Sequence, residues 1–340
     1  MGVGRRKHAL DDSMRMFIGL DVHKNFLQAA VLDAGGQLLK QERIPNSKDE
    51  IINFFQEFDK AKIVIESSST WYPIYQLLSE KHEVTLSNPT RTKAIAQAKV
   101  KTDKIDALTL AKLLRSGFIA ESYIPPRRIM DLRELVRYRA SLVRLRTMVK
   151  NRIHAQLLMH GIRIQDAYPF TRIYNEKLQA LQDYRIHGYL NIIESLNIQI
   201  TETSKRIRQT AIEDDDSKLL MTIPGIGYYS ALLITSEIGD VNRFPDSAHP
   251  CSYAGLTPST HSSGGATYHG RITKTGSRYL RWILTECTRT HIRHNPNSTI
   301  TRFYQKLTAR KGDGKAIVAA STKLLKIAFW VLKEKRPYHS

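Results

Sequence analysis

The sequence contains few cysteines. Among its 340 residues there are two, Cys251 and Cys287, which are too few for a disulfide framework and lack the paired spacing of a zinc site. We therefore expect both thiols to be reduced and to lie in the core.

The sequence also lacks an apolar run long enough to cross a membrane. Residues 316–332 come nearest, but Lys323 and Lys326 interrupt them, so an amphipathic helix is the better interpretation. Residues 1–14 start with basic residues but contain no apolar segment, and we expect an extension rather than a secretory signal. No GxxxxGK[ST] loop for ATP is present. These absences predict a cytoplasmic protein without a membrane partner.

Positive charge is abundant. Lys and Arg number 52 against 32 Asp and Glu, giving a formal net charge of +20. Such an excess favours a polyanionic partner, with nucleic acid ahead of an anionic membrane surface. A basic protein that binds neither is the alternative. The hydrophobic content of 41% is enough for ordinary cores.

Strand and helix patterns alternate over residues 15–125, after the extension of residues 1–14. Apolar strands end near Asp21 and Glu66, and a turn at residues 33–36 joins two further strands. A helix near residues 101–117 carries Asp103 and Asp106. This order predicts an α/β domain, with a mixed sheet and helices packed on it.

Residues 126–216 carry helical periodicity without strand signals. Two amphipathic helices, near 127–160 and 176–212, predict an antiparallel helical arm or a dimerising coiled coil. The polar face of the first is rich in arginine, and we expect nucleic-acid contacts at Arg133, Arg137 and Arg144. A plain helical linker with solvated arginines is equally consistent with the pattern.

Residues 217–340 predict a mostly helical C-terminal domain. Pro224-Gly225-Ile226-Gly227 between two helical stretches has the form of a helix–hairpin–helix. In such a turn the backbone N–H groups near Gly225 and Gly227 could hold a DNA phosphate. An ordinary tight turn between helices is the alternative.

Four carboxylates stand at positions that can converge. Asp21 and Glu66 end strands, and Asp103 and Asp106 are three residues apart on one helix face. Converging carboxylates repel one another unless a divalent cation neutralises them, which predicts Mg²⁺, or Mn²⁺, on these four residues. Taken singly, each would more often be a surface acid.

These acids also lie in motifs. The stretches Gly19–Lys24, Glu66–Ser68 and Lys101–Ala107 read GLDVHK, ESS and KTDKIDA. They resemble the DEDD core of RNase H/RuvC-like domains, and more closely the insertion-sequence transposases of the IS one-ten type, including their eleven-eleven subgroup and the Piv-like DNA invertases. Further stretches match that family's C-terminal pattern: Tyr253–Pro258, Ser263–Gly265, Gly270–Gly276 and Leu280–Arg281.

The resemblance implies that Ser263 is the nucleophile that attacks DNA. Flanking glycines would let backbone and hydroxyl approach a phosphate. Ser262 is the neighbouring candidate, and in isolation HSSGG would be read as a surface loop. Basic residues near the motifs are expected to contact nucleic acid: Lys24, Lys101, Arg271, Lys274, Arg278 and Arg281.

The function implied is that of a DNA transposase or recombinase with catalytic Ser263, Asp21, Glu66, Asp103 and Asp106. It would exchange strands between donor and target DNA through a transient phosphoserine link, without ATP. The resemblance also implies a structured guide RNA encoded by the element and a homo-oligomer, a dimer or a tetramer on DNA. Two alternatives stay open: a RuvC-like nuclease or junction resolvase that uses water, and a non-catalytic nucleic-acid-binding protein.

Overall fold

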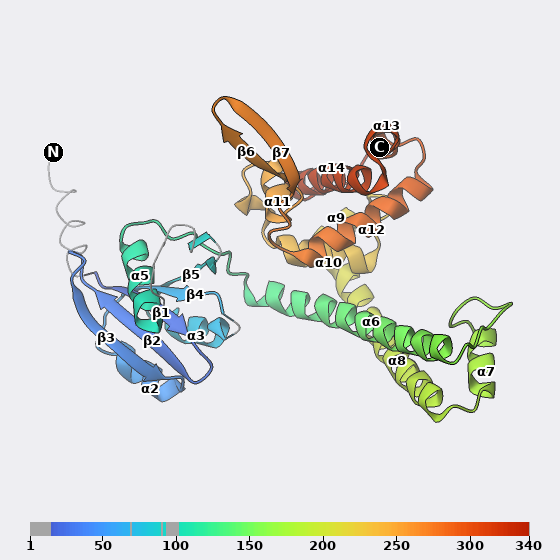
Figure 1. The fold of residues 1–340 in the computed structure, drawn as a ribbon. Helices are drawn as coiled ribbons and strands as arrows, with labels where there is room; N and C mark the ends of the chain where they lie inside the picture. Colours follow the sequence, from blue (N-terminus) through green and yellow to red (C-terminus); the bar gives the residue numbers. More distant parts are fainter. Residues whose placement is uncertain (1–14, 69, 90, 93–101, 340) are drawn as a thin grey trace. The chain divides into compact units, whose positions relative to one another are not determined.

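The computed structural model describes residues 15–68, 70–89, 91–92 and 102–339 (Figure 1). It divides the chain after Ile124 into an N-terminal and a C-terminal unit. The expected extension of residues 1–14 and the expected contact residue Lys101 lie outside the described residues.

The N-terminal unit is built on a five-stranded mixed sheet, as the sequence predicts. Its strands are β1 (Phe17–Val22), β2 (Phe26–Leu32), β3 (Leu38–Pro45), β4 (Lys62–Glu66) and β5 (Glu83–Ser87), in the order β3-β2-β1-β4-β5. The strands β1, β2 and β3 pair antiparallel, whereas β4 is parallel to β1 and β5 is parallel to β4. The central strands β1 and β4 are therefore largely buried on both faces.

Helices cover both faces of this sheet (Figure 1). The helices α2 (Lys48–Phe55) and α3 (Trp71–Leu78) share one core with side chains such as Ile18 and Leu20 of β1. Because side chains alternate along a strand, Gly19 and Asp21 face the opposite side, where α5 (Asp103–Arg115) contacts β1, β2 and β4.

The backbone of α5 lies directly against β1 at Gly19. A Cβ atom at this glycine would lie 2.1 Å from the carbonyl oxygen of Ala107 and 2.6 Å from the amide nitrogen of Ala111. No side chain fits in that space. Since the first turn of α5 carries Asp103 and Asp106, the missing side chain at Gly19 allows these carboxylates to approach the end of β1.

We predict that Gly19→Ala destabilises the N-terminal unit by about 1–3 kcal/mol, because the helix must move away from the strand. Hydrogen–deuterium exchange of peptides from β1 and α5 measures the loss of protection. Gly188→Ala is the matched control, because an added Cβ there meets nothing within 4 Å. Equal protection of β1 and α5 in wild type and Gly19→Ala would contradict the packing argument.

The C-terminal unit begins with a pair of long helices. Helix α6 (Arg127–Met159) leads through α7 (Arg172–Ala180) to α8 (Tyr184–Glu213). Two hydrogen bonds set their direction: Arg139 Nε donates to Ser204 Oγ at 2.8 Å, and Arg146 Nη1 donates to Asn197 Oδ1 at 2.7 Å. Rising residue numbers on α6 meet falling numbers on α8, so the helices are antiparallel, as one of the two sequence predictions states.

Shorter elements complete this unit and leave it mostly helical, as the sequence predicts. They are α9 (Asp215–Met221), α10 (Tyr228–Ile238), η1 (Val241–Arg243), α11 (Ala248–Tyr253), α12 (Arg278–His294), α13 (Thr299–Lys311), α14 (Asp313–Glu334) and a hairpin of β6 (Pro258–Ser263) and β7 (Ala266–Ile272). Within the described ranges, no helix is long and apolar enough to span a bilayer.

The arm formed by α6, α7 and α8 shares a hydrophobic core with the other helices of the C-terminal unit. Leu132 of α6 and Ile207 of α8 lie in the same hydrophobic core as α10, α12 and α14. Residues 125–340 therefore form one compact unit, and a functional division near residue 216 stays a prediction. The far end of the arm has a small core of its own that includes Ile153 and Ile186.

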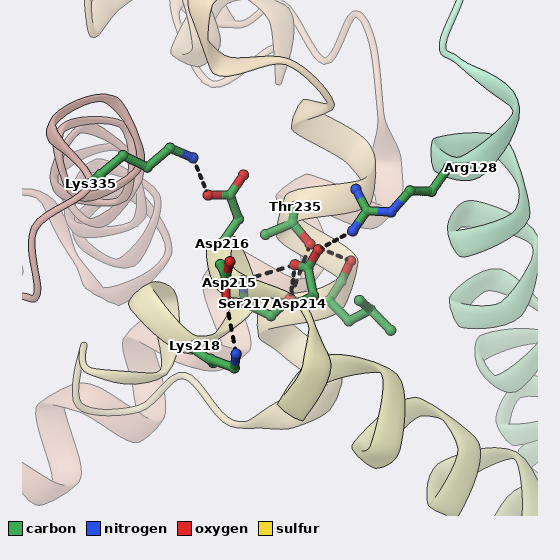
Figure 2. A network of polar contacts seen from close by, with 9 residues as sticks. Arg128, Asp214, Asp215, Asp216, Ser217, Lys218, Thr235 and Lys335 are labelled. Atoms are coloured by element: carbon green, nitrogen blue, oxygen red, sulfur yellow. Dashed lines mark hydrogen bonds and ion pairs between the residues drawn. The ribbon is translucent and has the colours of Figure 1, made fainter.

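Acidic residues around the start of α9 connect this helix to α6 and to the end of α14 (Figure 2). Asp214, which is 9% exposed, caps α9 by accepting a hydrogen bond from Ser217 N at 2.9 Å, and it also pairs with Arg128 of α6. Asp216 pairs with Lys335, just beyond α14. These contacts join the start of α6 to α9, and α9 to the end of α14.

Candidate functional site: an acidic cluster and a serine hairpin

The strand register of the N-terminal unit brings acids to one edge of the sheet. Leu20 of β1 pairs with Ile65 of β4, so Asp21 and Glu66 are the next residues on parallel neighbouring strands. Helix α5 begins at Asp103, where Thr102 Oγ1 accepts a hydrogen bond from Ile105 N and thereby fixes the first turn. Three separate elements thus deliver carboxylates to the same region.

A histidine that the sequence analysis did not assign lies among these acids. His23 Nε2 is 3.1 Å from Asp21 Oδ2 and 3.5 Å from Asp103 Oδ1. One ligand atom from each of Asp21, His23 and Asp103 lies within 4.8 Å of the other two. Glu66 and Asp106 do not belong to this closest group. The two-residue spacing between Asp21 and His23 was the available signal, since it places both on one side of an extended chain.

The electrostatics of Asp21 reflect this crowding. Burial raises the pKa of its carboxyl above 3.8, the neighbouring His23 lowers it, and the negative charges of Asp103 and Asp106 raise it again. The net direction is upward, which means that the ionised carboxylate is destabilised at this position. Oxygen and imidazole donors converging on an electrostatically unfavourable point fit a divalent cation.

We predict that Asp21→Asn raises the unfolding temperature of the metal-free protein at pH 7. A carboxyl with a raised pKa favours folding while it is protonated and loses that contribution as the pH rises through the folded-state pKa. The asparagine side chain of the variant carries no charge at any pH. The difference in unfolding temperature between variant and wild type should therefore vanish near pH 3, where Asp21 is mostly protonated in both the folded and the unfolded state. Thermal unfolding against pH measures this effect.

The same titration should be repeated with Mn²⁺. At 100 times its dissociation constant, a bound ion stabilises the wild type by about 2.7 kcal/mol, and Asp21→Asn should gain far less. Asp59→Asn, an exposed change of the same charge, should respond to Mn²⁺ as wild type does. An equal gain in all three proteins would place the ion elsewhere.

Ser263 lies at the tip of a β-hairpin in the C-terminal unit. It ends β6 and pairs with Ala266 of β7. Gly264 and Gly265 between them have φ values of 56° and 82°, as in a type I′ turn, whose twist suits a two-residue hairpin. HSSGG is therefore part of an ordered hairpin and not an irregular loop.

The two serines differ in their surroundings, although both are exposed. Ser262 Oγ lies 2.8 Å from Thr267 Oγ1 on the opposite strand. Within the described part of the chain, the Ser263 hydroxyl has no hydrogen-bond partner. The hydroxyl of Ser263 is thus the one available to a ligand at the tip.

Motif residues far from the tip form the base of the hairpin. The two backbones touch so closely that a Cβ at Gly255 would lie 2.1 Å from Thr275 O, and one at Gly276 would lie 1.9 Å from Tyr253 O. Arg281 Nη1 donates to the carbonyl oxygens of Ala254 at 2.8 Å and Thr275 at 2.9 Å, with Gly276 O at 3.3 Å. These contacts anchor the hairpin to α12.

Three arginines expected to contact nucleic acid also form hydrogen bonds within the protein, and their contact with nucleic acid stays a prediction. Arg281 holds the hairpin base as described. Arg133 donates to Ser236 O at 2.7 Å and Glu237 O at 2.9 Å, and Arg137 forms paired bonds with the Glu237 carboxylate, which is 1% exposed. Buried acceptors need such partners, so these guanidinium groups stabilise the fold.

The remaining expected contact residues are exposed. They are Lys24 after β1, Arg144 on α6, Arg271 on β7, Lys274 after β7 and Arg278 at the start of α12. Their side chains are positioned for a partner in solution, and their contact with nucleic acid stays a prediction.

The two glycines of the Pro224–Gly227 turn have different surroundings. Gly225 packs against α12, because a Cβ there would lie 2.7 Å from both Cys287 O and His291 N. This contact explains by helix packing why a glycine is needed here, and a phosphate contact of the turn stays a prediction. Gly227 is the N-cap of α10, and a Cβ there meets nothing within 4 Å, so only its side of the turn is open.

We predict that Arg281→Met loosens the hairpin base by about 2 kcal/mol, because it leaves carbonyl oxygens without a charged donor. Hydrogen–deuterium exchange of peptides from β6 and β7 measures it. Arg271→Met, which removes an exposed arginine from β7, is the control and should leave exchange unchanged. The same exchange in both variants would argue against an anchoring role for Arg281.

Comparisons with known proteins agree with the motifs. A family model described as "Transposase", for DEDD proteins of the IS110 type, matches residues 18–161. A second, described as "Transposase IS116/IS110/IS902 family", matches residues 217–305. The first match contains the acidic cluster, and the second contains the serine hairpin.

Curated proteins are similar over most of the chain. A putative transposase y4qE of Sinorhizobium fredii is 27% identical over 305 residues, covering 87% of this chain and 77% of its own. The transposase for insertion sequence element IS1111A of Coxiella burnetii is 24% identical, with 98% and 93% covered. A pilin gene-inverting protein of Moraxella bovis is 26% identical, with 81% of each chain covered.

Proposed function

Because the chain belongs to the IS110 family of insertion-sequence transposases, we propose that it cuts and rejoins DNA strands through a covalent bond to Ser263. The observation that carries the proposal is the convergence of Asp21 and Asp103 at one edge of the sheet, with the charge of Asp106 acting on Asp21. The enzyme is a DNA transposase or recombinase in which this cluster and the serine have complementary tasks.

The N-terminal unit would hold a divalent metal on Asp21, Glu66, Asp103 and Asp106, as in an RNase H/RuvC-like domain. The strand order and the raised pKa of Asp21, caused mainly by burial, support this role. When bound, Mg²⁺ or Mn²⁺ supplies charge that neutralises a phosphodiester and stabilises a leaving oxygen. The protein's own contribution is to hold the carboxylates close together, although burial and mutual repulsion disfavour the ionised form of Asp21.

The C-terminal unit would supply the nucleophile. Ser263 Oγ attacks phosphorus and loses its proton, an O–P bond of the DNA breaks, and the departing strand oxygen takes up a proton as a hydroxyl. In the reverse sense, a hydroxyl of the partner strand attacks the phosphoserine and returns Ser263. One O–P bond replaces another at each step, so no nucleotide hydrolysis is needed. The exposed tip hydroxyl and the anchored base support this assignment.

The partners in this proposal are nucleic acids and further copies of the chain. A net charge of +20 suits donor and target DNA. The family resemblance adds a structured RNA, encoded by the element, that selects the two DNA sites, and a homo-oligomer in which several protomers act on the DNA together. Exposed cations such as Arg144 and Arg271 are the candidates for backbone contacts.

We predict that purified protein, with a divalent metal, labelled element-end DNA and RNA transcribed from the element's flanks, forms a protein–DNA adduct that survives denaturing electrophoresis. Ser263→Ala should abolish the adduct, because the oxygen that bonds to phosphorus is gone. Ser262→Ala is the matched control and should retain it. Circular dichroism checks that both variants fold.

The outcomes separate this proposal from a nuclease that uses water. Such an enzyme would release cut DNA without an adduct, and Ser263→Ala would cut as well as wild type. Binding with no cutting, equal in Asp21→Asn and wild type, would instead indicate a non-catalytic nucleic-acid-binding protein. Either result overturns the serine mechanism.

A further inference from the structure

We propose that His23 is a nitrogen ligand of the metal centre and makes the centre prefer Mn²⁺ over Mg²⁺. The inference deepens the proposed function, because it requires a metal on the acidic cluster. It adds a residue to the four acids, and it assigns that residue a role in selecting the ion.

His23 belongs to the closest group of potential metal ligands, whereas Glu66 and Asp106 do not. The closest set of potential ligand atoms consists of Asp21, Asp103 and the imidazole of His23. The same ring nitrogen, Nε2, faces both carboxylates, at 3.1 Å and 3.5 Å. An ion bound by both aspartates would therefore meet this nitrogen as well.

Neighbouring residues hold the imidazole in this position. Its ring stacks on Phe26 with the centroids 4.5 Å apart, and the guanidinium of Arg43 lies 3.5 Å from the centroid of the Phe26 ring. Asn46 Nδ2 donates to the backbone carbonyl of His23 at 2.9 Å. A side chain fixed before the ion arrives loses little entropy on binding, which is typical of a built ligand and not of a freely rotating surface histidine.

The chemistry of the donors sets the preference between ions. Mg²⁺ is a hard ion that takes oxygen ligands and retains its water. An imidazole nitrogen suits transition ions better, and Mn²⁺ is the member of that series closest to Mg²⁺ in its use of carboxylates. A centre of two aspartates and one imidazole should thus accept both ions but bind Mn²⁺ more tightly than an all-oxygen centre would.

Electron spin-echo spectroscopy of Mn²⁺ bound to the full-length protein tests the ligand directly, without any measurement of activity. The expected spectrum contains a ¹⁴N coupling from a bound imidazole, and growth on ¹⁵N-histidine should convert it to a ¹⁵N coupling. His23→Gln should remove the coupling. His269→Gln, at an exposed histidine of β7, is the matched control and should retain it.

Competition between the two ions tests the preference. In wild type, the ratio of Mn²⁺ to Mg²⁺ affinity should exceed that of His23→Gln by about tenfold, the lower end of the range for changes around a metal ligand. The glutamine offers an oxygen in nearly the same place, so Mg²⁺ affinity should change less than Mn²⁺ affinity. The isotope experiment needs only wild-type protein, and the absence of a histidine coupling would overturn the role of His23 even if His23→Gln does not fold.

The results distinguish failure of this inference from failure of the proposed metal centre. Mn²⁺ that binds tightly, is lost in Asp21→Asn and shows no nitrogen coupling would leave the centre intact and overturn the role of His23. Mn²⁺ binding that Asp21→Asn leaves unchanged would overturn both. A histidine coupling that disappears in His23→Gln, together with the tenfold change in preference, supports both.

Discussion

The contact between α5 and β1 at Gly19 is the constraint on which the N-terminal unit depends. The helix backbone occupies the space that a side chain would fill, and this closeness brings the first turn of α5 to the end of β1. Asp103 then faces Asp21 and His23 across a few ångströms. Repulsion among the acids works against this arrangement, and the packing of strand and helix holds it together in the absence of a cation.

In the C-terminal unit, the fold presents the hydroxyl of Ser263 at the tip of the two-stranded hairpin of β6 and β7. A hairpin of two strands is marginal on its own. Here its base is fixed by the close contacts at Gly255 and Gly276 and by the bonds of Arg281 to backbone carbonyls. The sequence motif around the serine is therefore mostly a structural motif, and Ser263 is the exposed part that it supports.

Periodic apolar patterns made much of the fold predictable from the sequence. The strands that end near Asp21 and Glu66, the helix that carries Asp103 and the two long helices all follow from spacing and apolar runs. The hairpin of β6 and β7 was not predicted, because the sequence of β6, PSTHSS, lacks the alternation of apolar and polar residues that marks a strand. Its order comes from the turn and from contacts at its base that are distant in the chain.

The candidate site shows the same division between local and distant information. The four acids could be selected because each sits at the end or start of a predicted element. The internal roles of Arg133 and Arg137 could not be predicted, since their partner Glu237 is 100 residues or more away in the sequence. The packing of Gly225 could not be predicted for a similar reason, because the helix that packs on it begins far downstream.

The central proposal is that a divalent metal held by the acidic cluster assists the attack of Ser263 on DNA. Replacing a nonbridging oxygen of the scissile phosphate with sulfur tests it, because Mg²⁺ binds sulfur poorly and Mn²⁺ tolerates it better. We predict that one of the two sulfur isomers slows formation of the Ser263 adduct in Mg²⁺ and that Mn²⁺ restores the rate. An adduct that forms at the same rate with oxygen and with either sulfur isomer in Mg²⁺ would contradict the account.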